Sequence, residues 1–277
     1  MTISVQLGLL PGNDPADQAK WGADHGAEGV ELSAWGGLEG LRRVAEAVHG
    51  ILPVTSVCGN CDEAGNGSFD FLDPDPAKRR RSIEGSRALL EFCGEVGAAG
   101  QIVPPIFGPA RVPDLSPWKT PLEIEEELML ATLRELGPVA ASHGTLFLVE
   151  PLNRYEQHYL RRLSDAARVI DASNVPGLGI LADLFHMHIE ETDSPAALRE
   201  AGTRVRHVHL ADNTRMEPGS GDIDLAAAFA ALASTGFDGV LAYECGLRGD
   251  GPAERADHLA RSLSHVRALR DRAKIIS

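Results

Sequence analysis

The stretch TGFDGVLAYE (residues 235–244) holds the pattern that decides the fold. Gly236 stands where a helix would end, because glycine accepts the left-handed conformation that terminates a helix. The apolar run at 240–243 then has the length and composition of a buried strand, and the acid Glu244 follows it at once. The stretches HGAEGVEL (25–32) and HGTLFLVE (143–150) likewise have a glycine at the expected helix end, followed by a strand-like run. The pattern therefore predicts helices that lead directly into strands, and it hints at an internal repeat.

Short runs rich in Val, Ile and Leu recur along the whole chain, with amphipathic segments between them. The segments at 75–98 and 121–144 have apolar residues at three- and four-residue steps, the spacing of a helix with one buried face. We expect these strands to be apolar on both faces. Strands of this kind that are separated by helices cannot pair as hairpins, so we expect a parallel sheet with right-handed crossovers. The apolar runs begin near Ile3, Gly29, Pro53, Gln101, Leu146, Leu178, Val205 and Val240.

The number of these units selects the architecture. Eight strand–helix units favour an α/β fold of the (β/α)8 barrel type, which usually takes about 250 residues. The alternative is an open doubly wound sheet, for which a glycine-rich loop would follow the first strand. The segment LGLLPGND (7–14) has no GxGxxG motif. No linker divides the chain, so we expect a single barrel domain over residues 1–277, with its active site at the C-terminal ends of the strands.

The charge of the chain limits its partners. Forty acidic residues against 26 basic ones give a formal net charge of −14. Because this field repels polyanions, we expect neither nucleic acid nor an anionic membrane as a partner. The N-terminus lacks the pattern of a cleavable leader, and no run of about 18 apolar residues could span a membrane. These features predict a cytoplasmic protein.

Four successive apolar runs each finish in a residue that can bind a metal ion. Neighbouring strands lie about 4.8 Å apart, so side chains at matching heights can converge on one ion. For any single residue the alternative is a solvated side chain or a cap on the next helix. Three carboxylates and one imidazole suit Mn²⁺ first, with Mg²⁺ or Co²⁺ as alternatives. The residues are Glu150, Asp183, His209 and Glu244.

Longer motifs in the C-terminal half carry a family resemblance. The stretches VEPLNRYE (149–156), ADLFHMHIEE (182–191), HVHLADNTRMEPGSGDID (207–224) and AYECG (242–246) resemble the xylose isomerase-like sugar isomerase/epimerase superfamily, and most closely its D-tagatose 3-epimerase group. The resemblance implies one divalent metal ion on the four residues above. It also implies that Glu150 and Glu244 are the catalytic acid/base pair, that His186 and Arg215 contact the sugar, and that Glu156 lies close to the substrate.

The resemblance implies an isomerase, and specifically a ketose 3-epimerase that removes and returns a proton through a metal-stabilised enediolate. The expected substrate is a small sugar or polyol-derived ketone, preferably unphosphorylated. Two alternatives keep the same metal site, a hydroxypyruvate isomerase-like enzyme and an inosose dehydratase-like enzyme. A third is an abasic-site endonuclease, which would need more metal ligands and a basic surface. Relatives often pair, so a homo-oligomer is an open alternative to a monomer.

Several other residues are expected to have structural roles and no catalytic or binding role. We expect His207 to be a hydrogen-bonded core histidine, and His188 to lie in a loop or at a helix start without a partner. Apart from His186, the HMHIEE segment (186–191) is expected to be the loop that leads away from Asp183. The PGSG segment (218–221) is expected to be a plain turn, with a phosphate-binding nest as the alternative. Cys58 and Cys61 form a CGNC motif without a second ligand pair, so we expect reduced thiols.

Three aromatic residues outside the motifs keep two interpretations. They could line the substrate pocket or cover the rim of the barrel, and they fall in the part of the chain where loops would set substrate choice. They are Trp35, Phe107 and Trp118.

Overall fold

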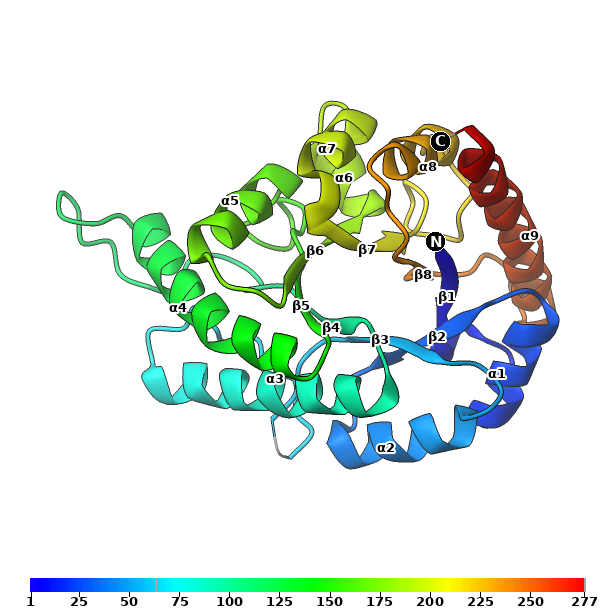
Figure 1. The fold of residues 1–277 in the computed structure, drawn as a ribbon, viewed down its shortest axis with the longest axis horizontal. Coiled ribbons are helices and arrows are strands. Elements are labelled where there is room, and N and C mark those ends of the chain that lie inside the picture. The colour runs from blue at the N-terminus through cyan, green and yellow to red at the C-terminus, as the bar shows by residue number, and fades with distance from the viewer. Residues whose placement is uncertain (63, 277) are drawn as a thin grey trace.

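The sheet closes into the predicted barrel. The computed structural model describes residues 1–62 and 64–276, and its strands are all parallel and ordered as in the chain (Figure 1). Closure comes from β1, which pairs with β2 on one side and with β8 on the other. The strands are β1 (Thr2–Gln6), β2 (Gly29–Ser33), β3 (Val54–Cys58), β4 (Gly100–Val103), β5 (Leu146–Val149), β6 (Leu178–Asp183), β7 (Val205–Leu210) and β8 (Val240–Tyr243).

Helices follow the strands and surround the sheet as a ring in Figure 1. After β6 the chain makes two helices in succession, and short 3-10 turns η1 (Leu7–Leu9) and η2 (Gly202–Arg204) precede α1 and β7. The α-helices are α1 (Pro15–Asp24), α2 (Gly37–Val48), α3 (Pro76–Val96), α4 (Pro121–Ser142), α5 (Leu163–Ser173), α6 (Leu184–Glu190), α7 (Ser194–Ala201), α8 (Leu225–Ser234) and α9 (Pro252–Ile276).

Local sequence signals fix where these helices begin and end. Thr120 and Glu123 form a reciprocal capping box at the start of α4, and Pro121 occupies its first turn. Helix α3 ends at Val96 and is capped by Gly97, which has a φ of 72°, a conformation that favours glycine. The long amphipathic segments of the sequence are therefore helices with defined ends.

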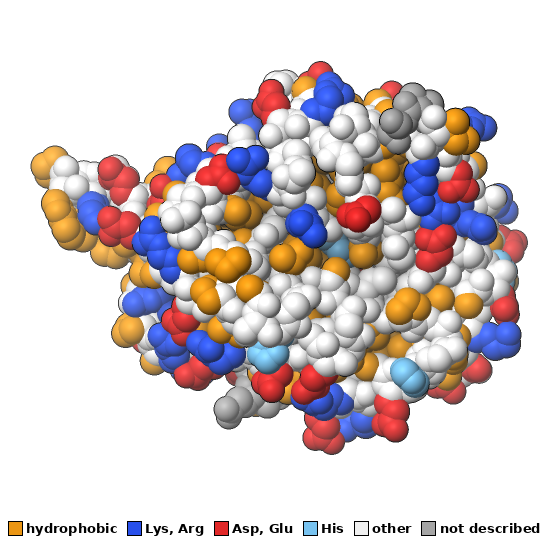
Figure 2. Space-filling view, in the orientation of Figure 1, with side chains coloured by type: hydrophobic (Ala, Val, Ile, Leu, Met, Phe, Trp, Pro, Cys, Tyr) orange, Lys and Arg blue, Asp and Glu red, His pale blue; other side chains and the backbone are white. Residues whose placement is uncertain are grey.

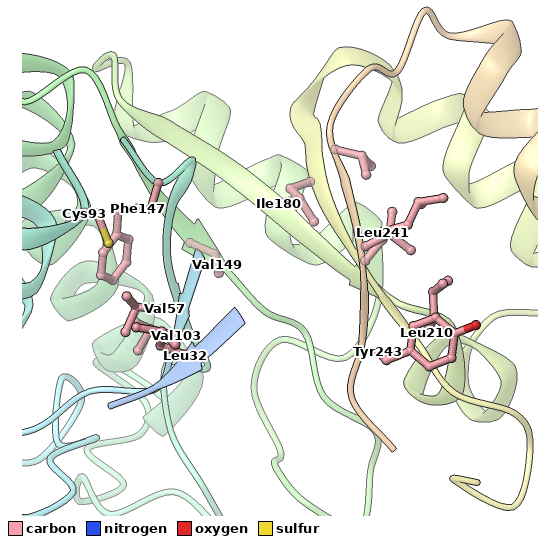
Figure 3. Close-up of a cluster of buried hydrophobic side chains, with 14 of the residues drawn as sticks. Leu32, Val57, Cys93, Val103, Phe147, Val149, Ile180, Leu210, Leu241 and Tyr243 are labelled. Carbon is pink, nitrogen blue, oxygen red and sulfur yellow. The ribbon is translucent and has the colours of Figure 1, made fainter. Parts of the chain in front are cut away.

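The largest apolar layer lies between the sheet and its helices. Figure 3 shows side chains from the outward faces of several strands, including Phe147, Ile180, Leu241 and Tyr243, with Cys93 contributed by α3. All five are completely or almost completely shielded from solvent. Close packing on this outer face leaves the inward face of each strand free to carry other chemistry.

The inside of the barrel is only partly apolar. Ile102, Leu148 and Leu181 form one small buried cluster there. Beside it are polar contacts, among them a 2.7 Å hydrogen bond between Ser4 and Thr55. The strands were expected to be apolar on both faces, and this part of the expectation is wrong for β1, β2, β3 and β7. Their inward side chains connect to the ion-binding end of the barrel, as described below.

An arm projects from the barrel between β4 and α4. Part of the segment 104–120 extends beyond the ring of helices in Figure 1, and Figure 2 shows hydrophobic side chains along the same projection. Trp118 on this arm is 72% exposed. Trp118 therefore stands away from the sheet interior rather than packing into it.

Among the described helices, none has a stretch long and apolar enough to cross a bilayer.

Candidate metal and sugar site

Four strand ends place their side chains around one point. Glu150 follows β5, Asp183 ends β6, His209 lies in β7 and Glu244 follows β8. One potential ligand atom from each residue lies within 4.8 Å of the others. Register explains the convergence, since Asp183 pairs with His209 on neighbouring strands. The structure thus brings together all four residues that the sequence nominated for a metal ion, and we call them the ligand cluster.

The ligand cluster fits a divalent cation. Glu150 Oε1, Asp183 Oδ2 and His209 Nδ1 are buried atoms without a hydrogen-bond partner. His209 Nδ1 lies 3.6 Å from Glu150 Oε1 and 3.3 Å from Glu244 Oε2. Unpartnered buried polar atoms are costly, and three carboxylates at this spacing repel one another. A divalent ion bound among them would satisfy both the orphaned atoms and the repulsion.

The pKa values of the ligand cluster reflect this crowding. Burial, together with the Glu244 carboxylate, raises the pKa of Asp183 to about 7. Burial also raises the pKa of Glu150. At Glu244 burial acts in the same sense, but the neighbouring His209 and Arg215 outweigh it and lower the pKa to about 2. Protonation and the cationic side chains therefore offset part of the negative charge that a bound metal ion would offset.

Asp183 divides its two oxygens between structure and the cluster. Its Oδ1 accepts hydrogen bonds from the backbone N–H groups of Phe185 (2.7 Å) and His186 (3.2 Å), and so caps α6. Its Oδ2 stays free for the cluster. The helix-cap interpretation of this strand-end acid is therefore confirmed, and the second oxygen leaves the predicted ligand role open to the same residue.

Glu31 is a residue of the site that the sequence analysis missed. It is completely buried in β2, and its carboxylate lies 3.1 Å from His209 Nε2. Ser56 (2.7 Å) and Gln6 (3.0 Å) donate hydrogen bonds to the same carboxylate. A carboxylate behind a histidine fixes the ring so that the other nitrogen faces the metal. Here that other nitrogen is Nδ1, which points into the ligand cluster.

Glu31 also belongs to a second group of potential ligands, with His207 and His209. His207 Nε2 lies 3.1 Å from Glu31 Oε2, and both side chains are fully buried. Burial works against ionisation of Glu31, but the two histidines hold its pKa well below the usual range. We therefore assign Glu31 to orienting His209. His207 is a core histidine, as expected, but neither of its ring nitrogens makes the expected hydrogen bond.

The three residues nominated for sugar contact lie together at the mouth of the cluster. Arg215 Nη1 lies 2.9 Å from Glu156 Oε1, and its Nη2 lies 3.1 Å from Glu244 Oε2. The guanidinium stands 4.9 Å from the ring centre of Phe185. The backbone of Arg215 has a φ of 57°, a conformation uncommon for residues other than glycine and often found at functional sites. His186 is buried beside them in α6.

Asn153 orients His186 and was also missed by the sequence analysis. Its backbone N–H (3.3 Å) and its side-chain amide (2.7 Å) both approach His186 Nδ1. A backbone N–H can only donate, so Nδ1 must accept and the ring hydrogen must sit on Nε2. Nε2 is buried, has no partner, and lies 3.7 Å from Asp183 Oδ2. The tautomer therefore presents a hydrogen-bond donor next to the ligand cluster.

The HMHIEE segment is a helix rather than the loop expected beyond Asp183. Helix α6 begins directly at the end of β6 because Asp183 supplies its cap. His188 lies near the end of this helix, and its Nε2 is 3.6 Å from Asp222 Oδ1, with both side chains partly or largely exposed. Its expected lack of a partner is therefore wrong, although an exposed pair of this kind contributes little.

The PGSG turn is filled by an acid of the chain itself. Asp212 is completely buried and accepts hydrogen bonds from the backbone N–H groups of Gly219 (2.9 Å) and Ile223 (3.1 Å). A Cβ on Gly221 would come within 2.4 Å of Asp212 Oδ1. The turn is therefore a nest for its own carboxylate, and those N–H groups are not available to a phosphate.

The CGNC cysteines are free thiols, as expected. Cys58 adjoins the ligand cluster, with its Sγ 3.6 Å from Glu244 Oε1. Burial and the Glu244 charge raise the pKa of this thiol well above its usual range. Cys58 can therefore donate a hydrogen bond to Glu244 as a neutral thiol.

Comparison with known proteins defines the family. The chain matches the family described as xylose isomerase-like TIM barrel over residues 19–269, so it belongs to that family. It is 35% identical to 3-dehydro-D-guloside 4-epimerase of Escherichia coli (strain K12) over 73% of this chain and 76% of that protein. The crystal structure of 3-keto-D-glucoside 4-epimerase from E. coli has a TM-score of 0.83 and 30% identity, covering 97% of this chain and 99% of that one.

A ketose 3-epimerase is also similar to this chain. D-psicose 3-epimerase of Enterocloster bolteae is 36% identical over 40% of this chain, and the alignment spans 37% of that protein. This span is less than two thirds of the relative's length. The predicted membership in the xylose isomerase-like group is confirmed, and the relatives named are epimerases, the class that the sequence resemblance implied.

The Glu31→Gln substitution tests the orienting role of this residue. We expect the affinity for Mn²⁺ to fall by about 10- to 100-fold, because a neutral amide no longer holds His209 or supports its basicity. Isothermal titration calorimetry on the metal-free protein measures the change. The exposed Glu46→Gln variant removes the same charge from a surface helix and serves as the control. An unchanged affinity in Glu31→Gln would remove Glu31 from the site.

Metal binding is expected to strengthen as the pH rises through about 7. A bound ion must displace the proton that Asp183, with its pKa raised to about 7, carries below that value. Affinity should therefore increase by about tenfold per pH unit for each proton released. The slope should become smaller above the Asp183 value but persist there, because His209, whose pKa is raised well above its usual range, must also lose a proton to bind the ion. Calorimetry in buffers of different ionisation enthalpy counts the protons released. Affinity that is flat with pH, with no proton release, would contradict the assignment of Asp183 as a ligand.

The Asn153→Asp substitution tests the His186 tautomer. A carboxylate beside Nδ1 attracts the ring hydrogen away from Nε2, so we expect turnover to fall by at least about tenfold with metal affinity retained. Nitrogen-15 NMR of labelled histidine in the Mg²⁺-loaded protein reports directly which nitrogen carries the hydrogen. The exposed Asn13→Asp variant is the control. A spectrum in which the hydrogen stays on Nε2 would refute the positioning role of Asn153.

Proposed function

We propose that this protein is a divalent-metal-dependent epimerase that inverts the carbon next to the carbonyl of a keto sugar. The observation that carries the proposal is the position of Glu150 and Glu244. They reach the same ligand cluster from β5 and β8, with Asp183 and His209 on the two strands between them. Two carboxylates that approach one site from different sides are what inversion at carbon requires, since one must remove a proton and the other must return one.

The two glutamates carry out the two proton transfers of the reaction. One glutamate takes the proton from the carbon next to the carbonyl, and the electron pair left behind moves into the carbon–carbon bond as the carbonyl oxygen gains charge. The other glutamate, entering as the acid, gives a proton to the opposite face of the same carbon. The atoms balance, and only the configuration changes. A divalent ion held by the ligand cluster supplies Lewis-acid stabilisation of the developing oxygen charge.

The surrounding residues orient the sugar. His186 Nε2 donates a hydrogen bond to a substrate oxygen beside the cluster, in the tautomer that Asn153 imposes. Arg215 offers a fixed fork of donors, and Glu156 accepts from hydroxyl groups. Arg215 and Glu156 are paired with each other, so substrate oxygens would replace contacts that the chain makes internally. Mn²⁺ is the proposed ion, with Mg²⁺ or Co²⁺ as alternatives.

The proposed substrate is a 3-keto-glycoside inverted at C4. The relative aligned over 76% of its own length carries a 4-epimerase name, and so does the crystal structure that covers 97% of this chain. A ketose inverted at C3 is the second candidate, favoured by the shorter matches to ketose 3-epimerases. Both reactions invert the carbon beside a carbonyl, so the site chemistry is the same. The Asp212-filled turn favours an unphosphorylated sugar.

The deciding experiment is turnover of the Mn²⁺-loaded protein in D₂O, followed by NMR. The substrates are a 3-keto-glucoside and a panel of ketoses. We expect a C4-inverted 3-keto-glycoside that carries deuterium at C4. A C3-inverted ketose would favour the second candidate, an aldose product would indicate isomerisation, and loss of water would indicate dehydration. No conversion of any substrate with the metal bound would refute the proposed function.

The Glu150→Gln and Glu244→Gln variants separate the two proton-transfer steps. Each is expected to lose epimerisation by about 10³-fold or more, because inversion needs both carboxylates. The remaining glutamate can still remove and return a proton on its own face. Each variant should therefore exchange deuterium into one epimer only, and the two variants should choose opposite epimers. Exchange into both epimers by either variant would contradict the two-glutamate assignment.

A further inference from the structure

Three aromatic side chains form a row on loops at the C-terminal ends of β2, β3 and β4. Trp35 and Phe69 have ring centres 6.4 Å apart, and Phe69 and Phe107 have ring centres 5.2 Å apart in an edge-to-face arrangement. Trp35 is 70% exposed and Phe107 is 40% exposed. We call these three residues the aromatic rim. It lies on the catalytic face, because all three loops follow strand ends.

The aromatic rim is continuous with the proposed site at both of its ends. Phe107 precedes Gly108, whose backbone N–H donates a 2.7 Å hydrogen bond to the carbonyl of Glu156. Phe69 packs over Gly59, where a Cβ would lie 3.7 Å from its ring. Gly59 follows Cys58, which contacts Glu244. The row therefore extends outward from residues that surround the ligand cluster.

Glycines hold the exposed end of the aromatic rim in place. The indole of Trp35 lies against Gly67, where a Cβ would come within 2.8 Å of the ring. The two loops approach so closely that a Cβ on Gly37 would lie 3.1 Å from the Cα of Gly65. Trp35 thus lies against the backbone at Gly67 while most of its side chain stays exposed. A group of exposed apolar side chains next to a polar site is a candidate ligand surface.

The chemistry of the aromatic rim suits an uncharged ring. Arg111, which lies nearby, is already engaged by Asp70 and by Asp73 (3.4 Å). Aromatic faces bind the apolar C–H faces of sugar rings and other aromatic groups, and each contact excludes water from both surfaces. A free ketose has only one short carbon chain, which the ligand cluster, His186 and Arg215 would already occupy. The aromatic rim is thus surplus to a monosaccharide.

We propose that the aromatic rim binds the aglycone or second ring of a glycoside while the keto-bearing ring lies over the ligand cluster. This inference rests on the proposed function and deepens it, because it assigns a binding surface to the part of the keto-glycoside beyond the keto-bearing ring and disfavours the free ketose that was the second candidate. Trp35 is then a specificity-determining residue that contacts substrate but takes no part in proton transfer.

The test compares phenyl 3-keto-glucoside with free 3-keto-glucose in the Mn²⁺-loaded protein. Wild type is expected to favour the glycoside in kcat/KM. Trp35→Ala should raise KM for the glycoside by about tenfold with kcat nearly unchanged, and should leave the free sugar unaffected. Trp118→Ala removes an equally exposed indole, 72% exposed, from the arm and should change neither value. Equal kinetics in wild type and Trp35→Ala would overturn the proposal.

A binding measurement separates this inference from the proposed function. Phenyl glucoside has no carbonyl and cannot react, so calorimetry of its binding does not depend on turnover. Tighter binding of phenyl glucoside than of glucose, lost in Trp35→Ala, supports the aromatic rim even if no keto sugar reacts. Sedimentation gives the remaining outcome: a wild-type dimer that dissociates in Trp35→Ala would show that a second copy of the chain covers the rim, which overturns the proposal.

Discussion

The site depends on burying four carboxylates at one end of a barrel with little positive charge to balance them. Glu31, Glu150 and Asp183 are almost completely shielded from solvent, and Glu244 is largely so. His209 stands between them, with Glu31 on one ring nitrogen and Glu150 and Glu244 on the other. Its pKa is raised well above the usual range, because these carboxylates outweigh the cost of burying a cation. Such an arrangement is unfavourable in isolation, and a bound divalent ion relieves it.

The scaffold tolerates this cost because its apolar packing lies elsewhere. The outer faces of the strands pack against the helices, while the interior has only a small apolar cluster around Ile102, Leu148 and Leu181. The inward positions of β1, β2 and β3 are thereby free for Gln6, Glu31 and Ser56, which support the histidine from behind. Stability and chemistry thus occupy opposite faces of the same strands, as the alternation of side chains along a strand allows.

The sequence allowed a site residue to be predicted where that residue ends an apolar run. It did not allow this where the role of a residue depends on contacts with residues that are distant in the chain. The eight strands begin within one residue of the predicted positions, and the four strand-end ligands converge as expected. Glu31 was missed because it sits inside a run, two residues before the end of β2. Asn153 was missed because its role is a hydrogen bond to His186, 33 residues away. The start of α6 was also missed, since the cap at Asp183 depends on the geometry of the strand end.

The double use of Asp183 restricts which residue can occupy its position. One oxygen holds the first turn of α6 and the other faces the ligand cluster. Asparagine would keep the cap but bring no charge, while the longer glutamate is a poor cap for a helix that starts at the very next residue. The loops around the site could therefore change with the preferred ion or substrate. Position 183, in contrast, would accept neither asparagine nor glutamate in place of aspartate.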